Sequence, residues 1–165
     1  TYRNRCEIAG ANGKQILSIP VEGGRDHHQL YKEVCIDYGN HWNKKHWQSI
    51  RSAYGSAPYF EFYADRFQAV YEKKIESLFE FNLEVLGIIL QAVKMNYEFA
   101  FTSVYEKHLT GSFDLRNAKE DTVPFRLPRY HQVFEDRNGF MPNLSVIDAV
   151  FNLGPHTKDY LLSVK

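Results

Sequence analysis

The sequence predicts an α/β fold in which helices cover a mixed β-sheet, with an α+β arrangement as the alternative. Two observations predict it. Segments that alternate apolar with other residues occur near the start and again at 96–105 and 131–135, as in β-strands. Between them, apolar residues over 41–94 recur at the three- and four-residue spacing of helices. The 165 residues show neither an internal repeat nor a low-complexity linker, so we expect a single domain over 1–165.

The first predicted elements are three short strands. EIAG and QILSIPV flank Asn12-Gly13, and Asn-Gly is a strong hairpin signal because both residues tolerate positive φ. After a loop at 21–29, the segment KEVCIDY at 32–38 alternates well enough for a third strand.

Helices are predicted for the middle of the chain. Asn40 is the expected N-cap of a helix over 41–54, and a second helix covers 58–71. The segment 74–94 has the longest helical pattern and is apolar around much of its circumference, so we expect it to be central and buried.

The second half of the chain is predicted to return to strands and then end in helices. Residues 96–105 alternate most clearly, and 131–135 is a candidate short strand. Asn143 is expected to cap a helix that ends at Asn152, and a last helix covers 156–164.

Charge and composition exclude several classes of protein. Lys and Arg together number 20, as do Asp and Glu, so the basic excess of a duplex-binding protein is missing and we expect no nucleic-acid partner. The longest apolar run, at 85–90, is too short to span a bilayer, and no signal-peptide pattern is present. Cys6 and Cys35 lack the spacing of a disulfide framework, which is typical of reduced thiols in a cytoplasmic protein.

The stretch HWNKKHWQSIRSAYGSAPYF at 41–60 concentrates the most potential chemistry. Along a helix at about 100° per residue, His41 and His46 lie roughly 140° apart. Two histidines that share a metal ion on one helix are normally four residues apart, so we expect no metal here. We expect no cofactor either. His46 falls on the buried face, where two interpretations remain open. It either donates a hydrogen bond inside the core, or lines a pocket with Tyr54 as an acid/base or binding group.

Arginine and amide side chains provide the candidate substrate-binding residues. Arg3, Asn4 and Arg5 are clustered before the first strand, and arginine forks suit phosphates and carboxylates, although they could also be ordinary surface residues.

The loop SFDLRNA carries Asp114, Arg116 and Asn117, which could contact a ligand or form a local ion pair or helix cap. These three residues are candidate binding residues because loops carry function more often than their share.

Two more candidates lie in the stretch FRLPRYHQVFEDR. Alternation places Tyr130 and Gln132 on one face of the predicted strand, either towards a ligand or as the core face of a surface loop. Asn143 and Asp148 either cap the following helix or contact a ligand. No GxSxG, P-loop or GxGxxG motif is present, which argues against the corresponding hydrolases, NTPases and dinucleotide-binding enzymes.

Several segments, in order along nearly the whole chain, resemble one known family. They are TYRNRCEIAGANGKQILSIPV, the pattern HWxxxHWxSIxxAY followed by SAPYFEFY, then DLRNA, and QVFEDRNGFMPNLSVIDAVFNLGP. Together they resemble the WbqC-like protein family, and they look most similar to its members from the Bacteroides group. The family also carries an N-terminal segment with a tyrosine-leucine-proline signature, so we expect such a segment to precede this sequence.

The resemblance implies a function in the synthesis of surface sugars. Family members occur among genes for O-antigen and surface-polysaccharide assembly, which implies a cytoplasmic enzyme that transfers a group onto a nucleotide-activated sugar. In that case His46 is the acid/base candidate, Tyr54 is its neighbour, and the arginine clusters anchor the anionic ligand. The alternative is a non-catalytic binding or scaffold protein of the same pathway.

Overall fold

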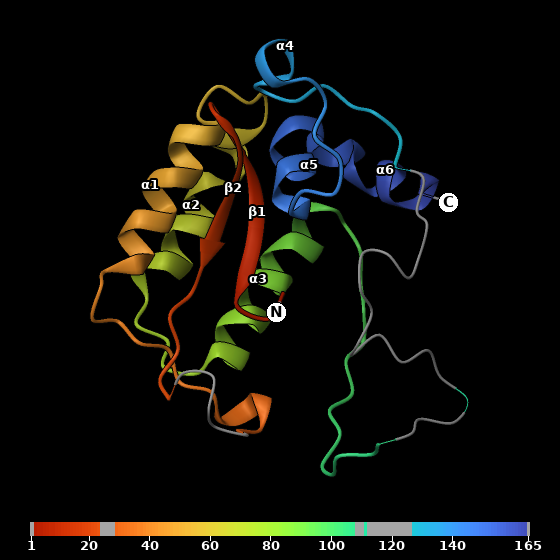
Figure 1. Ribbon diagram of the computed structural model, residues 1–165. Helices are drawn as coiled ribbons and strands as arrows, with labels where there is room; N and C mark the ends of the chain where they lie inside the picture. The colour runs from red at the N-terminus through yellow and green to blue at the C-terminus, as the bar shows by residue number, and fades with distance from the viewer. Residues whose placement is uncertain (1, 24–28, 108–110, 112–126, 165) are drawn as a thin grey trace.

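The computed structural model describes residues 2–23, 29–107, 111 and 127–164, which form a β-hairpin and a set of helices (Figure 1). The strands are β1 (Arg5–Gly10) and β2 (Gly13–Ser18). The helices are α1 (Trp42–Tyr54), α2 (Phe60–Glu72), α3 (Leu78–Ala92), α4 (Glu135–Asn138), α5 (Val146–Leu153) and α6 (Thr157–Ser163), with short 3₁₀ helices at Tyr31–Glu33 and Gly154–His156.

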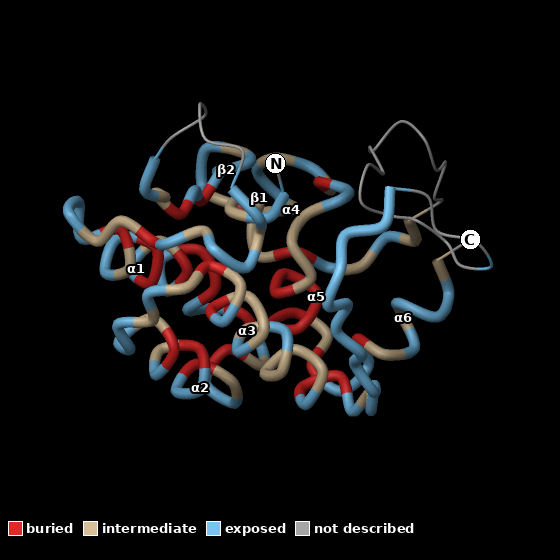
Figure 2. Tube along the Cα trace, turned by 90° about the horizontal axis from the view of Figure 1, so that it is seen from below, coloured by how far each residue is buried: buried red, intermediate tan, exposed pale blue. Residues whose placement is uncertain are grey.

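The predicted hairpin is confirmed. β1 and β2 pair antiparallel, from Arg5 opposite Ser18 to Gly10 opposite Gly13, and Gly13 has the positive φ of 108° that favours glycine at this turn. Seen from below, the hairpin lies on one side of the helices, and buried residues concentrate between the two (Figure 2). The hairpin is therefore one layer of the fold, and its inner face is part of the core.

Aromatic side chains hold the helical layer together. Phe151 of α5 is fully buried, and its ring centroid lies 5.2 Å from that of Tyr54 in α1. It also lies 5.1 Å from Phe60 and 5.4 Å from Phe67, both in α2. The Phe151 ring on α5 therefore contacts both α1 and α2, the two helices formed by the His-Trp stretch and the residues that follow it. Such offset and edge-on contacts add to the free energy gained by burying the rings.

The three helices predicted for the middle of the chain are confirmed, but the third is less buried than expected. In α3 only Leu78, Phe81 and Ala92 are buried, and Leu86 is 36% exposed. Apolar residues extend around more of the circumference of α3 than the neighbouring helices cover. No helix of the described residues is both long enough and apolar enough to cross a membrane.

The mixed α and β composition is confirmed, but the described sheet is only the two-stranded antiparallel hairpin. The strand predicted at 32–38 forms isolated bridges instead, between Cys35 and Ser77 and between Val21 and Ile36. The one predicted at 131–135 is a turn that leads into α4. Among the residues that the structure describes, neither segment pairs with a strand long enough for a continuous ladder.

The segment 96–105, whose alternation is the clearest in the sequence, is neither strand nor helix. Phe99 and Phe101 remain 53% and 65% exposed, so the alternating aromatic residues face no sheet of the described part of the chain. Phe101 contacts only the ring of Phe79 among the described aromatic residues, at 5.7 Å. Alternation specifies which residues would share a face, but a strand forms only where a partner strand accepts its hydrogen bonds.

The C-terminal end of α5 is fixed by a close approach of backbone and ring. Gly154 follows α5 with a positive φ of 54°, and a Cβ atom there would collide with the ring of Tyr59. The hydroxyl of the fully buried Thr157 donates to the carbonyl oxygens of Ala149 at 3.0 Å and Gly154 at 2.7 Å, satisfying carbonyls at the helix end. Only glycine fits this position.

Replacement of Gly154 by alanine should therefore lower the free energy of unfolding by about 2 kcal/mol or more, from backbone strain and overpacking against Tyr59. Gly87, inside α3 with open space around its Cβ position, offers a matched control. Gly87→Ala should raise the same free energy by about 0.5–1 kcal/mol, since alanine is the better helix former. Urea denaturation of both variants measures the difference. Equal stability of Gly154→Ala and the unmodified chain would contradict the close approach.

Candidate functional site

A cavity of about 130 Å³ lies behind the hairpin, where the N-terminal residues cross the helices. We call it the N-terminal cavity. Residues from β1, β2, α1, α2, α3 and the start of α5 line it, among them Arg3, Asn4, Arg5, Cys6, His46 and Tyr71. Four of the residues predicted from the sequence to bind or act on a substrate are thus brought together.

His46 is both packed in the core and in contact with this cavity. Its side chain is only 8% exposed, and its ring lies 5.0 Å from that of Trp42 and 6.3 Å from that of Tyr71. Burial lowers the pKa of the imidazole to about 4, and a hydrogen bond with the backbone of Ser18 acts in the opposite direction. The imidazole is therefore neutral at pH 7, and the burial that keeps it neutral also makes it a weak base.

The other titratable groups inside the cavity are also uncharged at neutral pH. Burial raises the pKa of the Cys6 thiol to about 11, assisted by the neighbouring carboxylate of Glu7. Burial likewise raises the pKa of the Tyr71 hydroxyl. The charged residues that line the cavity are Arg3 and Arg5, both exposed. An anionic ligand would therefore meet its cations at the mouth and uncharged side chains inside.

The three residues at the mouth have different local partners. The guanidinium of Arg3 lies 5.2 Å from the ring centroid of Tyr31, a cation–π contact that orients it. Asn4 donates from its side chain to the carbonyl of Ile19 at 3.0 Å, and its own carbonyl accepts from the Ile19 N–H at 2.8 Å. Asn4 thus extends the hairpin, whereas Arg3 and Arg5 are the side chains placed to contact a ligand.

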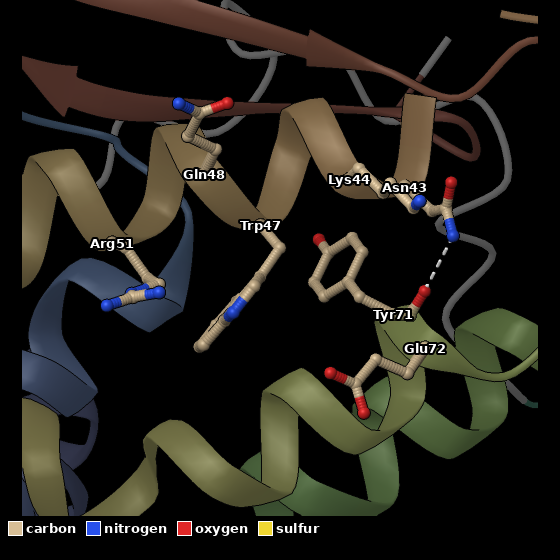
Figure 3. A pocket seen from close by; sticks show the side chains of 7 residues that line it. All are labelled: Asn43, Lys44, Trp47, Gln48, Arg51, Tyr71 and Glu72. Atoms are coloured by element: carbon tan, nitrogen blue, oxygen red, sulfur yellow. Dashed lines mark hydrogen bonds between the residues drawn. The ribbon is translucent and has the colours of Figure 1, made fainter. Parts of the chain in front are cut away.

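Tyr71 also forms a wall of a second space. On its other side an open groove runs between α1 and α2, into which Tyr71 and Trp47 project from the two helices (Figure 3). Tyr71 is the residue that lines both the N-terminal cavity and this groove.

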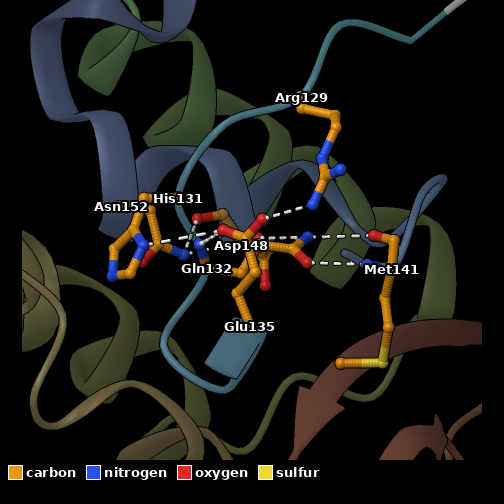
Figure 4. A network of polar contacts seen from close by, with 7 residues as sticks. All are labelled: Arg129, His131, Gln132, Glu135, Met141, Asp148 and Asn152. Carbon is orange, nitrogen blue, oxygen red and sulfur yellow. Dashed lines mark hydrogen bonds and ion pairs between the residues drawn. The ribbon is translucent and has the colours of Figure 1, made fainter. Parts of the chain in front are cut away.

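A second group of predicted residues gathers around Asp148, forming what we call the Asp148 cluster. Tyr54 donates to Asp148 Oδ2 at 2.9 Å, and Tyr130 donates to Oδ1 at 2.7 Å. Gln132 and Asn152 each donate to Oδ1 at 3.3 Å (Figure 4). Four donors from α1, α5 and the segment before α4 thus converge on one carboxylate.

The carboxylate of Asp148 is fully buried, and no residue of the described part of the chain forms an ion pair with it. Burial raises the pKa of Asp148, while the hydrogen bonds from its four donors lower it. Burial and the nearby carboxylate raise the pKa values of Tyr54 and Tyr130, so both hydroxyls stay protonated and donate. The cluster is therefore stabilised by neutral donors rather than by a counter-ion.

The sequence-based interpretation of Asp148 as a helix cap is corrected by this geometry. Ser145 is the N-cap of α5, its carbonyl accepting from the Asp148 N–H at 2.9 Å, while the Asp148 side chain points into the core. One signal in the sequence could have indicated this. Asp148 lies inside the run VIDAVF, where a carboxylate on a buried helix requires several donors.

Tyr54 does not line the N-terminal cavity with His46. The two residues lie eight positions apart on α1, a rise of about 12 Å, and they meet opposite ends of the hairpin. His46 contacts the backbone of Ser18, whereas the Tyr54 hydroxyl accepts from the Ala9 N–H at 3.2 Å. Because the Tyr54 hydroxyl both donates to Asp148 and accepts from Ala9, it acts here as a buried connector.

The remaining predicted site residues fall elsewhere. Asn143, expected to be a helix cap, is exposed with a φ of 57° and precedes the true N-cap by two residues. It shares with Tyr130 a cavity of about 160 Å³ beside α6. Asp114, Arg116 and Asn117 lie outside the described residues.

Within the described ranges, no three His, Cys, Asp or Glu side chains are grouped so that they could hold a metal ion.

Comparison with known proteins gives one family and one curated relative. The WbqC-like protein family matches residues 1–119, a range that contains the hairpin, α1, α2 and α3. An uncharacterized protein of Mycobacterium tuberculosis, Rv1507c, is 26% identical over 188 residues, covering 97% of this chain and 81% of the relative. No solved structure matches the chain.

Replacement of Asp148 by alanine should lower the free energy of unfolding by about 3 kcal/mol or more, because it leaves four buried donors without their acceptor. Asp65, exposed on α2, is the matched control, and Asp65→Ala should change that free energy by less than about 0.5 kcal/mol. Denaturant titrations at pH 7 compare the two variants. Similar losses in both would contradict the central position of Asp148.

The lowered pKa of His46 predicts a specific pH dependence. The folded protein keeps this imidazole neutral down to about pH 4, whereas in the unfolded chain it takes up a proton near the ordinary histidine pKa of 6.5. Its contribution to stability is therefore complete above pH 6.5 and is lost as the pH falls towards 4.

Relative to His46→Gln, the unmodified chain should lose about 1–3 kcal/mol of unfolding free energy over that interval. Urea titrations at intervals between pH 7 and pH 4 measure it. Parallel pH profiles for the two proteins would show that His46 is not protected from protonation.

Proposed function

The chain belongs to the WbqC-like protein family, and we propose that it acts in surface-polysaccharide and O-antigen biosynthesis, as a cytoplasmic enzyme that transfers a group onto a nucleotide-activated sugar. The observation that carries this proposal is the N-terminal cavity, where His46 lies behind Arg3 and Arg5. The family match supports the choice of cavity, since the matched residues 1–119 include all three.

The two arginines supply the contacts that a nucleotide sugar needs at its charged end. A guanidinium binds phosphate oxygens through paired N–H donors, and it stays charged at every physiological pH. Arg3 and Arg5 are exposed at the mouth of the cavity, so a diphosphate would bind there without being fully desolvated. The nucleotide would therefore stay outside, with one group of the sugar directed into the cavity.

Inside the cavity, His46 is the group able to move a proton. A sugar hydroxyl or amine would attack the activated donor and form a bond to the transferred group, while the bond to the donor's leaving group breaks. The proton of the attacking group would pass to the neutral imidazole and from there to the departing leaving group. Cys6 and Tyr71 hold their protons at this pH and so do not compete with His46 as bases. Tyr54 is not part of this step, because its hydroxyl donates its hydrogen bond to Asp148.

A non-catalytic binding protein of the same pathway is the second candidate. The cavity of about 130 Å³ is smaller than the roughly 300–1,000 Å³ of ordinary small-molecule sites, so only one chemical group of a ligand fits inside. The hydrogen bond between His46 and the backbone of Ser18 also suits a structural histidine. On this alternative the arginines bind the ligand and no proton is transferred.

Thermal unfolding with a panel of nucleotide sugars tests binding. A ligand at 100 times its Kd adds about 2.7 kcal/mol to the unfolding free energy, which should raise Tm by several degrees. The double variant Arg3→Gln/Arg5→Gln should lose that rise. Arg66→Gln, an exposed arginine on α2, should keep it.

His46→Gln separates the two candidates. If His46 is the base, the variant keeps the thermal shift but loses conversion of the bound nucleotide sugar, followed by mass spectrometry with activated acyl donors present. If the unmodified chain binds but converts nothing, the binding protein is the better description. No thermal shift with any nucleotide sugar would remove the main support for both.

A further inference from the structure

The open groove between α1 and α2 takes no part in the function proposed above. Its volume is about 650 Å³, within the range of ordinary small-molecule sites. We call it the α1–α2 groove. Five of its lining residues come from one face of α1, between Asn43 and Arg51, and the other two are Tyr71 and Glu72 of α2 (Figure 3).

Trp47 forms the floor of the groove, and its indole N–H has no partner among the described residues. The side chain is 9% exposed, and Nε1 makes no hydrogen bond with any residue that the structure describes. Both ring neighbours of Trp47 are stacked on it, Phe60 at 6.1 Å and 19° and Tyr71 at 6.1 Å and 26°. With two rings already stacked on it, this indole offers a ligand mainly its unpartnered N–H.

Above the floor, α1 presents three side chains that are available to a ligand. Lys44, Gln48 and Arg51 are exposed, and their side chains make no hydrogen bond or ion pair with the described residues. Their spacing of four and three residues places them along one face of the helix, over about 10 Å. Nε1 of Trp47 is itself shielded from solvent, so a ligand reaches it only when neighbouring side chains move.

The charge of the groove favours an anion. Lys44 and Arg51 face a single carboxylate, Glu72, which already accepts from Gln68 Nε2 at 2.6 Å. The side-chain amide of Asn43 is likewise occupied, donating to the Tyr71 carbonyl at 2.9 Å. The groove therefore holds a set of N–H donors with two positive charges against one negative charge, and such donors bind oxyanions through charge-assisted hydrogen bonds.

We propose that the α1–α2 groove is a second ligand site, which binds a phosphate or carboxylate group on a sugar-sized molecule. Arg51 and Lys44 contact the oxyanion, Trp47 Nε1 donates to one of its oxygens, and Gln48 contacts a neighbouring hydroxyl. The site is distinct from the N-terminal cavity and does not depend on the function proposed for it, since none of its cations lines that cavity.

Two-dimensional ¹H–¹⁵N NMR tests the proposal directly, because the chain contains only two tryptophans. Trp42 Nε1 also lacks a partner among the described residues but belongs to the core and lines neither space, so its signal is an internal reference. Titration with glucose 1-phosphate and, separately, with glucuronate should shift the Trp47 indole signal saturably for at least one ligand. Glucose itself serves as the uncharged control. A shift with glucose 1-phosphate identifies phosphate as the group bound, and a shift with glucuronate identifies carboxylate.

Paired variants make the test specific to the groove. Lys44→Gln/Arg51→Gln should weaken binding by about tenfold or more, as expected for lost charge-assisted hydrogen bonds. Lys45→Gln/Arg66→Gln removes the same charge from exposed positions that do not line the groove, and should bind as the unmodified chain does. The dispersion of signals in the same spectra shows whether each variant is folded. If the double variant Lys44→Gln/Arg51→Gln is unfolded, the single variant Arg51→Gln replaces it in the test.

Three results would overturn the proposal. They are no shift of the Trp47 signal with either anion, an equal shift with glucose, or equal weakening in the two paired variants. Since the nucleotide-sugar test relies on Arg3 and Arg5, its failure would leave this result unaffected.

Discussion

The fold depends on a buried carboxylate whose partners among the described residues are all neutral hydrogen-bond donors. Asp148 connects α5 to α1 through Tyr54, and Tyr54 in turn holds the backbone of β1 at Ala9. Through Gln132, which exchanges hydrogen bonds of 2.9 Å and 2.8 Å with the backbone of Met141, the same carboxylate positions the segment before α5. Because each of these groups would be left unsatisfied by a shift of its neighbours, their relative positions are fixed together.

The hairpin therefore has one closed end and one open end. At the Ala9 end it is tied to α1 and α5 by the Asp148 cluster. At the Ser18 end it meets His46, and the N-terminal residues cross a space that the described side chains do not fill. A rigid anchor at one end and a cavity at the other is the arrangement expected of a site built on a stable scaffold. Within α1, His46 lies at the cavity end of the hairpin and Tyr54 lies at the anchored end.

The sequence predicts what is local and misses what depends on a partner. The hairpin and the helices α1, α2 and α3 follow from Asn-Gly and from apolar spacing, both of which act over a few residues. The segment 96–105 has the alternation of a strand, but within the described ranges no strand pairs with Phe99 or Phe101, and pairing is set by the tertiary structure. The pattern of a single sequence carries no information on which strand, if any, a segment pairs with.

The candidate site shows the same division. Arg3, Asn4, Arg5 and His46 are candidates because of their chemistry, and the structure places them around one cavity. The pairing of His46 with Tyr54 rests on helical periodicity, which gives the face of a helix but not which neighbour each turn meets. A position near a helix start, as Asp148 has, is common for caps, whereas its partners Tyr54 and Tyr130 are distant in sequence.

The position of Tyr71 has a thermodynamic consequence. Its ring is the common wall of the α1–α2 groove and the N-terminal cavity, so a ligand that displaces it changes both spaces at once. Such a displacement would change the affinity of the other space for its ligand, and linkage would make the factor the same in both directions. Coupling of this kind would pass through one aromatic side chain and would need no movement of one domain against another.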